Sequence, residues 1–417
     1  MPRFSEDREK KHAASATASF ASDRQKVKRR KICVITTSRA DFGLLRELLA
    51  CIRRDSALRL QLIVSGMHLA PEFGITVREI EASGVKIDQR IDLQLTGSSG
   101  LENAKSVGRG VASFAEAFSK LHPEIIVMLG DRFELLSPAI AALMLRIPIA
   151  HIHGGERSEG AMDESIRHAI TKMSSLHFAA TESYRRRIAQ MGESPGSVYN
   201  FGAPGLDQLY TAPLLTRSEL EHELGFSLRD PFALVTYHPV TRDTSSAIAQ
   251  IRCLIGAIKA SGLRAVFTMA NADAEGAAIN ARLMTACAHN PDRFKWIPHL
   301  GHRRYLSCLK YFSVMVGNSS SGLVEAPSFR LPVVNIGDRQ RGRERAANII
   351  DVPCTRAAIL NGIKRAVSAR FRTSLRGMRN PYDRFRDGRA SERIKNVLRD
   401  VKISDDFLKK HFHDLPY

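Results

Sequence analysis

Short runs of β-branched and apolar residues alternate with amphipathic helical stretches along this chain, and no other feature constrains its fold as strongly. This alternation is typical of βαβ units, whose strands lie parallel in one sheet. In the first half the predicted strands are Ile32–Thr37, Arg59–Val64, Ile125–Leu129, Ile147–His151, Leu176–Ala180 and Val198–Phe201. In the second half they are Phe232–Tyr237, Ala265–Met269, Phe294–Ile297, Val314–Gly317 and Val333–Ile336. The sequence predicts an α/β protein with two Rossmann-like domains whose parallel sheets face a central cleft.

The length of 417 residues exceeds the usual size of one core and suits two domains. We expect a disordered basic extension over residues 1–30, an N-terminal domain over 31–210 and a C-terminal domain over 211–382. A helical segment over 383–417 is expected to cross back to the N-terminal domain. Predicted helices include Gly43–Arg54 and Gly108–Leu121.

The formal net charge of +19 is high, and much of it lies near the two ends of the chain. A basic balance suits an acidic small molecule such as a nucleotide, and equally nucleic acid or an anionic surface. Charge without interleaved aromatic residues is weak evidence for nucleic-acid binding, so we expect no nucleic-acid partner. No apolar run reaches the length of a membrane span, and six scattered cysteines without a CxxC pair are typical of reduced thiols. We therefore expect a cytoplasmic protein that does not insert into membranes.

Ionisable residues follow two predicted strands of the first half at the point where each strand ends. Asp131, Arg132 and Glu134 follow Ile125–Leu129, while His153 and Glu156 follow the next strand, with Asp163 shortly after. Ligands of open α/β sheets bind at the carboxyl ends of the strands, so these residues are expected to share one rim. This set favours acid/base chemistry.

In the second half, Gly317-Asn318-Ser319-Ser320-Ser321-Gly322 lies between a strand and a helix expected to begin at Leu323. Backbone N–H groups at a helix N-terminus attract phosphate, although a plain serine N-cap is an alternative. Glu325 is placed to hold ribose hydroxyls. Arginines at 339, 341 and 343 are placed to neutralise a diphosphate.

Other polar residues at strand ends are weaker candidates. Asp41 follows the first strand and is placed to cap a helix, His238 ends a strand in the second half, and Asn271 and Asp273 follow another. Each also has an ordinary structural explanation. The histidines at 151, 153, 168 and 177 offer one extended HxH pair, but no third ligand at a familiar spacing, so we predict no metal. Neither GxGxxG after the first strand nor GxxxxGK[ST] occurs, which removes the usual sequence support for dinucleotide oxidoreductase and P-loop chemistry.

Taken in order, SRADFG, GMHL, GDRFE, HIHGGE, GAMDESIRHAITK, HPVT, NADAEG, GNSSSGLVE and GDRQRGR resemble the motifs of the hydrolysing UDP-N-acetylglucosamine 2-epimerases, which supply N-acetylmannosamine to sialic acid synthesis. The resemblance begins at about Lys31 and covers most of the chain. It implies a GT-B fold, a UDP-sugar substrate, no metal or other cofactor, and a homodimer or homotetramer.

The resemblance also implies the reaction. Enzymes of this family eliminate UDP across C1–C2 to give a 2-acetamidoglucal and then add water, which releases N-acetylmannosamine. A carboxylate near C2 takes the proton and stabilises positive charge at C1, and an acid on the opposite face completes the inversion. The implied acid/base and sugar-binding residues are Asp131, Glu134, Glu156 and Asp163, with His238 near the diphosphate or the glycosidic oxygen. The implied UDP-binding residues are Arg39, Ser319, Ser320, Glu325 and Arg339, with Arg132 at the sugar or phosphate. The matched motifs add Asp41, His68, Asn271 and Asp273 as substrate-binding candidates.

One position departs from a related group. The non-hydrolysing epimerases typically carry a glutamate at the third position of HIHGGE, where this chain has His153. If that glutamate is a catalytic acid, its role here passes to His153 or to Glu156. Histidine titrates near neutrality and suits such a role.

Three alternatives stay open. The first is the same reaction on UDP-2,4-diacetamido-2,4,6-trideoxyglucose, which leads toward legionaminic acid. The second is a GT-B glycosyltransferase, which would need an acceptor groove but no carboxylates on both faces of the sugar. The third is a basic protein without enzymatic activity that binds nucleic acid or a surface.

Overall fold

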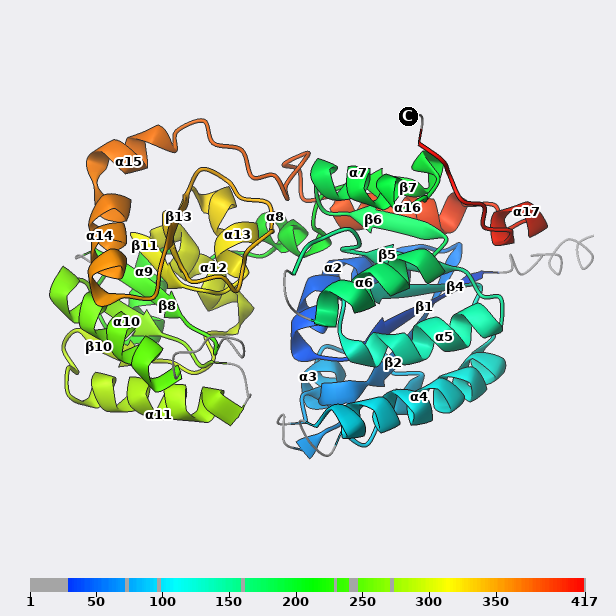
Figure 1. Cartoon of the computed structure of the whole chain (residues 1–417), viewed down its shortest axis with the longest axis horizontal. Coiled ribbons are helices and arrows are strands. Elements are labelled where there is room, and N and C mark those ends of the chain that lie inside the picture. The colour runs from blue at the N-terminus through cyan, green and yellow to red at the C-terminus, as the bar shows by residue number, and fades with distance from the viewer. Residues whose placement is uncertain are drawn as a thin grey trace, which may run out of the picture.

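The computed structural model describes residues 29–71, 75–95, 99–158, 162–228, 231–239, 247–270 and 274–415. Two sheets of parallel strands, each flanked by helices, form two lobes that lie side by side (Figure 1). We call the part built on the seven-stranded sheet the first lobe and the part built on the six-stranded sheet the second lobe. The predicted α/β fold with two parallel sheets is confirmed.

The first lobe contains a sheet with strand order β3-β2-β1-β4-β5-β6-β7. Its strands are β1 (Arg30–Thr36), β2 (Leu58–Ser65), β3 (Gln89–Ile91), β4 (Ile125–Leu129), β5 (Ile149–Ile152), β6 (Leu176–Ala179) and β7 (Val198–Asn200). Its helices are α2 (Arg39–Arg54), α3 (Val77–Ala82), α4 (Gly100–Leu121), α5 (Leu136–Met144), α6 (Met162–Met173) and α7 (Glu182–Gln190). Short 3₁₀ turns are η1 (Gly66–His68), η3 (Phe133–Leu135), η4 (Pro195–Ser197) and η5 (Pro204–Asp207).

The second lobe contains a sheet with strand order β10-β9-β8-β11-β12-β13. Its strands are β8 (Phe232–Thr236), β9 (Arg264–Phe267), β10 (Phe294–Trp296), β11 (Val314–Gly317), β12 (Val333–Ile336) and β13 (Ile349–Val352). Its helices are α9 (Arg217–Leu224), α10 (Ala247–Ser261), α11 (Ala274–Ala288), α12 (Gly301–Tyr311), α13 (Ser321–Val324), α14 (Arg356–Val367) and α15 (Ala369–Ser374), with a 3₁₀ turn η6 (Ala326–Phe329). The remaining helices are α8 (Gln208–Thr211), between the lobes, and α16 (Ala390–Asp400) and α17 (Asp405–Leu408).

The strands are apolar on both faces because helices cover both sides of each sheet, as expected for parallel sheets. In β1, Ile32 and Val34 pack into a core with α2, while Cys33 and Ile35 pack into a second core with Phe114 of α4. The second lobe repeats this two-sided arrangement. The buried sheets fix the positions of the loops at the carboxyl ends of their strands.

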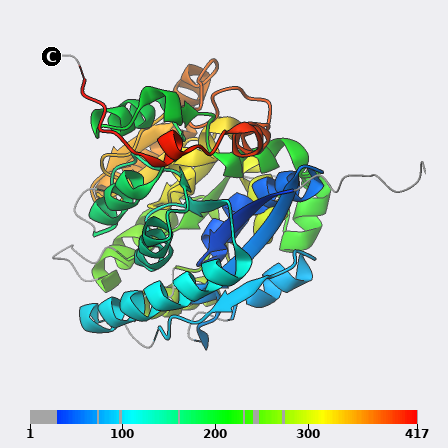
Figure 2. The same ribbon diagram turned by 90° about the vertical axis from the view of Figure 1, so that its right-hand side faces the viewer.

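Helix α16 packs against α2 in the first lobe, although it follows the whole second lobe in sequence. Ile394 and Leu398 enter the same core as β1, and Lys395 Nζ lies 3.0 Å from Asp55 Oδ2. Figure 2, in which the first lobe faces the viewer, shows this C-terminal segment in red. The domain boundaries proposed from the sequence stay predictions.

Most predicted elements occur within a few residues of the expected bounds, but two strands were missed. β3 and β13 form outer edges of their sheets and are only three and four residues long. Two helices begin earlier than predicted, because α2 begins at Arg39 and α4 at Gly100. In the described ranges, no helix is both long and apolar enough to cross a membrane. All six cysteines are free thiols.

Candidate active site

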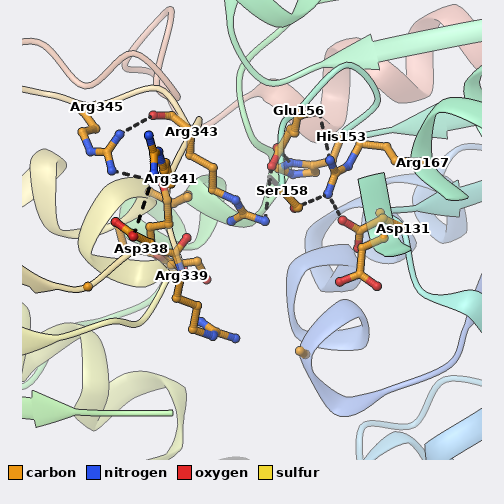
Figure 3. Close-up of a pocket in the computed structure, with 18 of the residues that line it drawn as sticks. Asp131, His153, Glu156, Ser158, Arg167, Asp338, Arg339, Arg341, Arg343 and Arg345 are labelled. Carbon is orange, nitrogen blue, oxygen red and sulfur yellow. Dashed lines mark hydrogen bonds and ion pairs between the residues drawn. The ribbon is translucent and has the colours of Figure 1, made fainter. Parts of the chain in front are cut away.

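A cavity of about 1260 Å³ lies between the lobes and is lined by loops at the carboxyl ends of strands from both sheets. The close-up in Figure 3 shows Asp131, His153, Glu156, Ser158 and Arg167 facing a series of arginines from the second lobe. The first lobe thus presents acid/base groups, and the second presents positive charge, across one space.

The first-lobe groups meet because β4 and β5 are adjacent parallel strands that end together. Leu129 pairs with Ile152, and the Gly130 N–H donates to the Ile152 carbonyl at 3.0 Å. Gly130 has φ +89°, a conformation that glycine adopts readily. The chain can therefore turn away directly after β4, and His153, with φ +64°, turns it directly after β5, which places Asp131 and His153 at the same rim.

Arg167 of α6 connects the loops of this rim. Its Nη2 donates to Asp131 Oδ2 and, at 2.8 Å, to Ser158 Oγ, while its Nη1 donates to the Glu156 carbonyl at 2.9 Å and to Glu164 Oε2 at 3.2 Å. The side chain is 1% exposed. Burial lowers the pKa of Arg167 to about 9, and Arg343 adds to this effect, so the guanidinium still carries its charge at neutral pH.

Arg167 was not among the site residues predicted from the sequence. It occupies a core-facing position of an amphipathic helix, next to the buried Ile166, and an arginine at such a position rarely stays buried unless it is paired. The i−3 spacing from Glu164 was a second signal. Together these two features would have marked Arg167 as a buried partner of the nearby carboxylates.

His153 and Glu156 form a close pair. His153 Nδ1 lies 2.5 Å from Glu156 Oε1, and His153 adopts φ +64°. His153 Nε2 is buried and has no hydrogen-bond partner among the described residues. Burial raises the pKa of the Glu156 carboxyl, but His153 and Arg343 outweigh it and hold the pKa below its usual value. Glu156 is therefore an ionised carboxylate in the wall of the cleft.

Arg343 reaches from the second lobe to this pair. Its Nη2 lies 3.7 Å from Glu156 Oε2. Figure 3 shows the Arg343 side chain extending from the second lobe toward Glu156. Burial lowers the pKa of Arg343, but the negative charge of Glu156 outweighs this and raises it. This ion pair joins the two sides of the cavity.

Asp163, at the start of α6, has a different environment. Burial raises the pKa of its carboxyl, although Arg132, Arg343 and Arg339 oppose the shift. Asp163 is thus more easily protonated than Glu156. Carboxyl groups with pKa values shifted in opposite directions suit an acid and a base in one site.

Arg132 lines the cavity and rests on Glu134. Its Nη2 donates to Glu134 Oε1 at 2.7 Å, and the Glu134 side chain is fully buried. Glu134 is not among the residues that line the cavity, so in this structure it positions Arg132. A direct catalytic role for Glu134 stays a prediction.

The second lobe lines the cavity with Ser320, Glu325 and the arginines at 339, 341, 343 and 345. We call residues 337–345 the arginine loop and residues 317–322 the serine-rich turn. Arg339 Nη1 donates to the Asn318 carbonyl at 3.0 Å, so this hydrogen bond connects the arginine loop to the serine-rich turn. Burial raises the pKa of Glu325, whose Oε2 has no hydrogen-bond partner among the described residues. Ser319 lies in the same turn, where its Oγ accepts from the Ser321 N–H at 3.4 Å.

The helix expected at Leu323 begins instead at Ser321 and ends at Val324, followed by the 3₁₀ turn η6. Pro327 accounts for the early end, because proline clashes with a continuing helix. The helix thus begins two residues before the expected position. A helix this short has only a small dipole. An anion would therefore be bound here mainly by side chains and by the backbone N–H groups of the loop.

Asp41 was expected to cap its helix, and it does so from the third position of a capping box in which Ser38 is the N-cap. Asp41 accepts from the N–H groups of Thr37 and Ser38, at 2.7 Å each, and from both of their hydroxyls. Asp41 lines the cavity, but its carboxylate is occupied by the turn that begins α2.

His68 is buried and is not among the residues that line the cavity. Its Nε2 lies 3.0 Å from Thr36 Oγ1 and its Nδ1 lies 2.8 Å from Thr76 Oγ1, so both ring nitrogens have partners. Burial lowers its pKa. In this structure His68 fixes the loop that follows β2.

Arg39 and His238 lie beside the lined cavity. Arg39 Nη1 is 3.2 Å from His299 Nδ1 of the second lobe, and its Nε is 3.1 Å from Glu79. Burial, with the charge of Arg339, lowers the pKa of His238 to about 3, so its imidazole is neutral. Asn318 holds the His238 backbone through two hydrogen bonds of 2.8 Å. Asn271 and Asp273 lie outside the described residues.

The histidines considered as metal ligands have separate partners. His151 contacts the Gly130 carbonyl and Thr171, His168 contacts Glu164, and His177 contacts Glu193. The left-handed backbone at His153 also removes the extended geometry assumed for the HxH pair. Within the described part of the chain, no group of three His, Cys, Asp or Glu is placed to hold a metal ion.

Two α/β lobes, each built on a parallel sheet, with a cleft between them that is lined by ionisable side chains, define a protein of the GT-B type. A solved structure with this fold is the UDP-GlcNAc 2-epimerase of Neisseria meningitidis bound to UDP-GlcNAc, with a TM-score of 0.76 and 16% identity over 88% of this chain and 99% of that chain. At the sequence level, the family described as UDP-N-acetylglucosamine 2-epimerase matches residues 50–399. The chain belongs to this family and is an epimerase-type enzyme.

Two relatives are similar over most of their length. A GDP/UDP-N,N'-diacetylbacillosamine 2-epimerase (hydrolyzing) of Campylobacter jejuni is 41% identical over 326 residues, which cover 78% of this chain and 84% of the relative. A UDP-N,N'-diacetylbacillosamine 2-epimerase (hydrolyzing) of Legionella pneumophila is 39% identical over 382 residues, which cover 91% and 98%.

Proposed function

We propose that this enzyme is a hydrolysing 2-epimerase, which converts a UDP-linked 2-acetamido sugar and water to UDP and the free sugar with inverted C2. The observation that carries the proposal is the division of the cleft: carboxylates and His153 on the first lobe face arginines on the second. The names of the two hydrolysing relatives support the same reaction.

The reaction would proceed in two balanced steps. In the first, a carboxylate takes the C2 proton while the C1–O bond breaks, and UDP leaves with the bonding electrons to give a 2-acetamidoglucal. In the second, water supplies a hydroxyl group to C1 and a proton is added to the opposite face of C2. No electrons enter or leave, so the proposed reaction uses no redox cofactor, and we propose no metal.

The first lobe would act on the sugar. Glu156 is the preferred base, because His153 and Arg343 keep it ionised. Asp163 is the preferred acid, because burial favours its protonated form. Asp131 would contact the sugar, and His153 would set the charge and position of Glu156 or act as the acid itself. Glu134 would act by positioning Arg132.

The second lobe would hold UDP. The diphosphate carries negative charge, which suits the arginines of the 337–345 loop and the hydroxyl group of Ser320, all of which line the cavity. We also propose a contact for Ser319, which lies in the same turn. The free oxygen of Glu325 is suited to accept hydrogen bonds from ribose hydroxyls. We also propose UDP contacts for Arg39 and, near the glycosidic oxygen, for His238, together with a homodimer or homotetramer.

Two substrates are candidates. The motifs resemble those of enzymes that act on UDP-N-acetylglucosamine, whereas the two relatives are named for N,N'-diacetylbacillosamine, a 2,4-diacetamido-2,4,6-trideoxy sugar. Both carry the same UDP and 2-acetamido group and differ at C4 and C6. The proposed chemistry is the same for both.

The test is turnover of each UDP-sugar in deuterium oxide, followed by proton NMR. Release of UDP with a C2-inverted free sugar that carries deuterium at C2 is the expected result. Release of the uninverted, unlabelled sugar would mean simple hydrolysis and would overturn the proposal. Sugar transfer that depends on an added acceptor would favour a glycosyltransferase. The substrate with the higher kcat/KM identifies the sugar.

A further inference from the structure

Two buried tyrosine hydroxyls join the lobes beside the active site. Tyr184 OH lies 2.9 Å from Tyr382 OH. The Glu344 N–H donates to Tyr184 OH at 2.9 Å, and Tyr382 OH donates to the Glu344 carbonyl at 3.2 Å. Tyr184 belongs to α7 in the first lobe, Glu344 to the arginine loop of the second, and Tyr382 to the segment that leads to α16. The ring therefore ties three separate segments together.

The direction of every hydrogen bond in this ring is fixed. A backbone N–H only donates and a backbone carbonyl only accepts, and each hydroxyl has one proton to donate. Tyr382 uses its proton on the Glu344 carbonyl, so Tyr184 must donate to Tyr382. Burial raises the pKa of Tyr184 to about 12 and also raises that of Tyr382, so both protons are present at neutral pH. Removing either hydroxyl breaks the ring.

The ring holds the residue next to Arg343. Ser183 Oγ also donates to Glu344 Oε2, and Arg345 Nη1 donates to the Arg343 carbonyl at 3.3 Å. The side chain of Arg343 then extends to Glu156, at 3.7 Å. Movement of this backbone away from the first lobe would lengthen the distance between the two charges.

We propose that Tyr184 and Tyr382 are positioning residues, which hold Arg343 against Glu156 and so set the electrostatic environment of that carboxylate during the reaction. The role assigned to Glu156 rests on the proposed function. The hold on the Glu344 backbone does not, because it follows from the hydrogen-bond ring alone.

The main test uses Tyr382→Phe and Tyr184→Phe, which keep the ring volume and remove one hydroxyl each. The expected result is a fall in kcat of about tenfold and a shift of the acidic limb of the kcat–pH profile upward by about half a unit, because loss of a nearby positive charge raises a carboxyl pKa. Arg343→Met should shift the limb at least as far. The double variant Tyr382→Phe/Arg343→Met should then show no further shift.

A matched control is Tyr210→Phe. Its hydroxyl donates to Asp383 Oδ2 at 2.6 Å, so it also bonds the segment near Tyr382, but it lies outside the ring. This variant should keep the wild-type pH profile. A variant Tyr382→Phe that loses thermal stability but keeps the wild-type pH limb would overturn the proposal, as would additive limb shifts in the double variant.

Amide hydrogen exchange separates this inference from the proposed function. In Tyr184→Phe, the Glu344 amide loses its acceptor and should exchange at least about tenfold faster, whatever substrate the enzyme uses. Unchanged exchange would overturn the ring. Faster exchange in a protein that turns over neither UDP-sugar would contradict the proposed reaction and leave the ring supported.

Discussion

His153 Nδ1 lies 2.5 Å from Glu156 Oε1, and the histidine reaches this position through a left-handed backbone conformation at φ +64°. The pair lies where two adjacent strands of the first lobe end, and it faces the arginines of the second. The proposed chemistry of the cleft depends on this pair more than on any other contact.

Replacement of Glu156 by glutamine should abolish most turnover. Glutamine has a similar shape but cannot accept the C2 proton, so kcat should fall by about 10²–10⁴-fold, the usual range for loss of a general base. Affinity for UDP, measured by calorimetry, should stay within a fewfold of wild type. Glu392→Gln, on the exposed part of α16, is the control and should keep full activity. Wild-type kcat in Glu156→Gln would contradict the proposed base.

The variant His153→Asn tests the role of the imidazole while it keeps the backbone conformation of His153. Asparagine tolerates the left-handed conformation better than most residues, so the loop should keep its shape. Loss of the imidazole removes the group that most lowers the pKa of Glu156, and that pKa should rise. The acidic limb of the kcat–pH profile should therefore move to higher pH, which rate measurements that extend well below pH 4.5 would detect. An unchanged limb would show that the imidazole does not set the ionisation of Glu156.

Arg167→Lys tests the connection between the rim loops. Lysine keeps the charge but cannot replace the forked guanidinium that contacts Asp131, Ser158 and Glu164. Breaking such a buried network should lower the free energy of unfolding by about 3 kcal/mol and reduce kcat as the loops shift. Urea denaturation measures the first effect. Arg186→Lys, on the exposed side of α7, is the control; a loss of less than about 0.5 kcal/mol in Arg167→Lys would contradict this account.

Because of Glu193, the free energy of unfolding should fall as the pH is lowered into the acid range. Burial raises the pKa of its carboxyl, but hydrogen bonds from His177, Lys172 and Lys410 outweigh burial and lower the pKa to about 2. Because the folded pKa is depressed, the stabilisation is fully present above the unfolded value near 4.5 and is lost as the pH falls toward 2.

Lys410→Met removes one of these partners from the C-terminal segment. The variant should be less stable than wild type at pH 7 by about 1–2 kcal/mol, and the difference should shrink as the pH falls below 4.5 toward 2. Urea denaturation at several pH values measures this. Lys409→Met, on an exposed neighbour, is the control. A difference between Lys410→Met and wild type that stays constant across this range would contradict the assigned role of Glu193.

The sequence predicted what depends on local pattern. Strands such as Ile125–Leu129 are continuous apolar runs because they are buried on both faces, and their ends mark the rim of the cleft. The edge strand β3 reads Gln-Arg-Ile, with one buried residue, so it lacked both the length and the apolar pattern of a strand. An edge strand forms backbone hydrogen bonds with one neighbouring strand instead of two, so its sequence is less constrained.

Contacts between distant segments were not predictable in this way. Tyr184 and Tyr382 are 198 positions apart, and nothing near either residue indicates that they meet. Glu134 and Asp41 were candidate site residues from the sequence, but only the structure shows that Glu134 supports Arg132 and that Asp41 closes the turn before α2. The identity of a residue predicts its available chemistry, whereas its partners are set by the packed fold.

The return of α16 to the first lobe has a consequence for how the lobes can move and be separated. Two covalent crossings connect them, one near Ala203 and one near Tyr382, and the Ala203 N–H donates to the Tyr382 carbonyl at 2.8 Å, so the crossings run together. Both connections between the lobes therefore lie at one place, and any opening of the cleft has to bend the chain there. No single cut in the chain releases an intact first lobe, because a fragment that ends before α16 leaves the core around α2 uncovered.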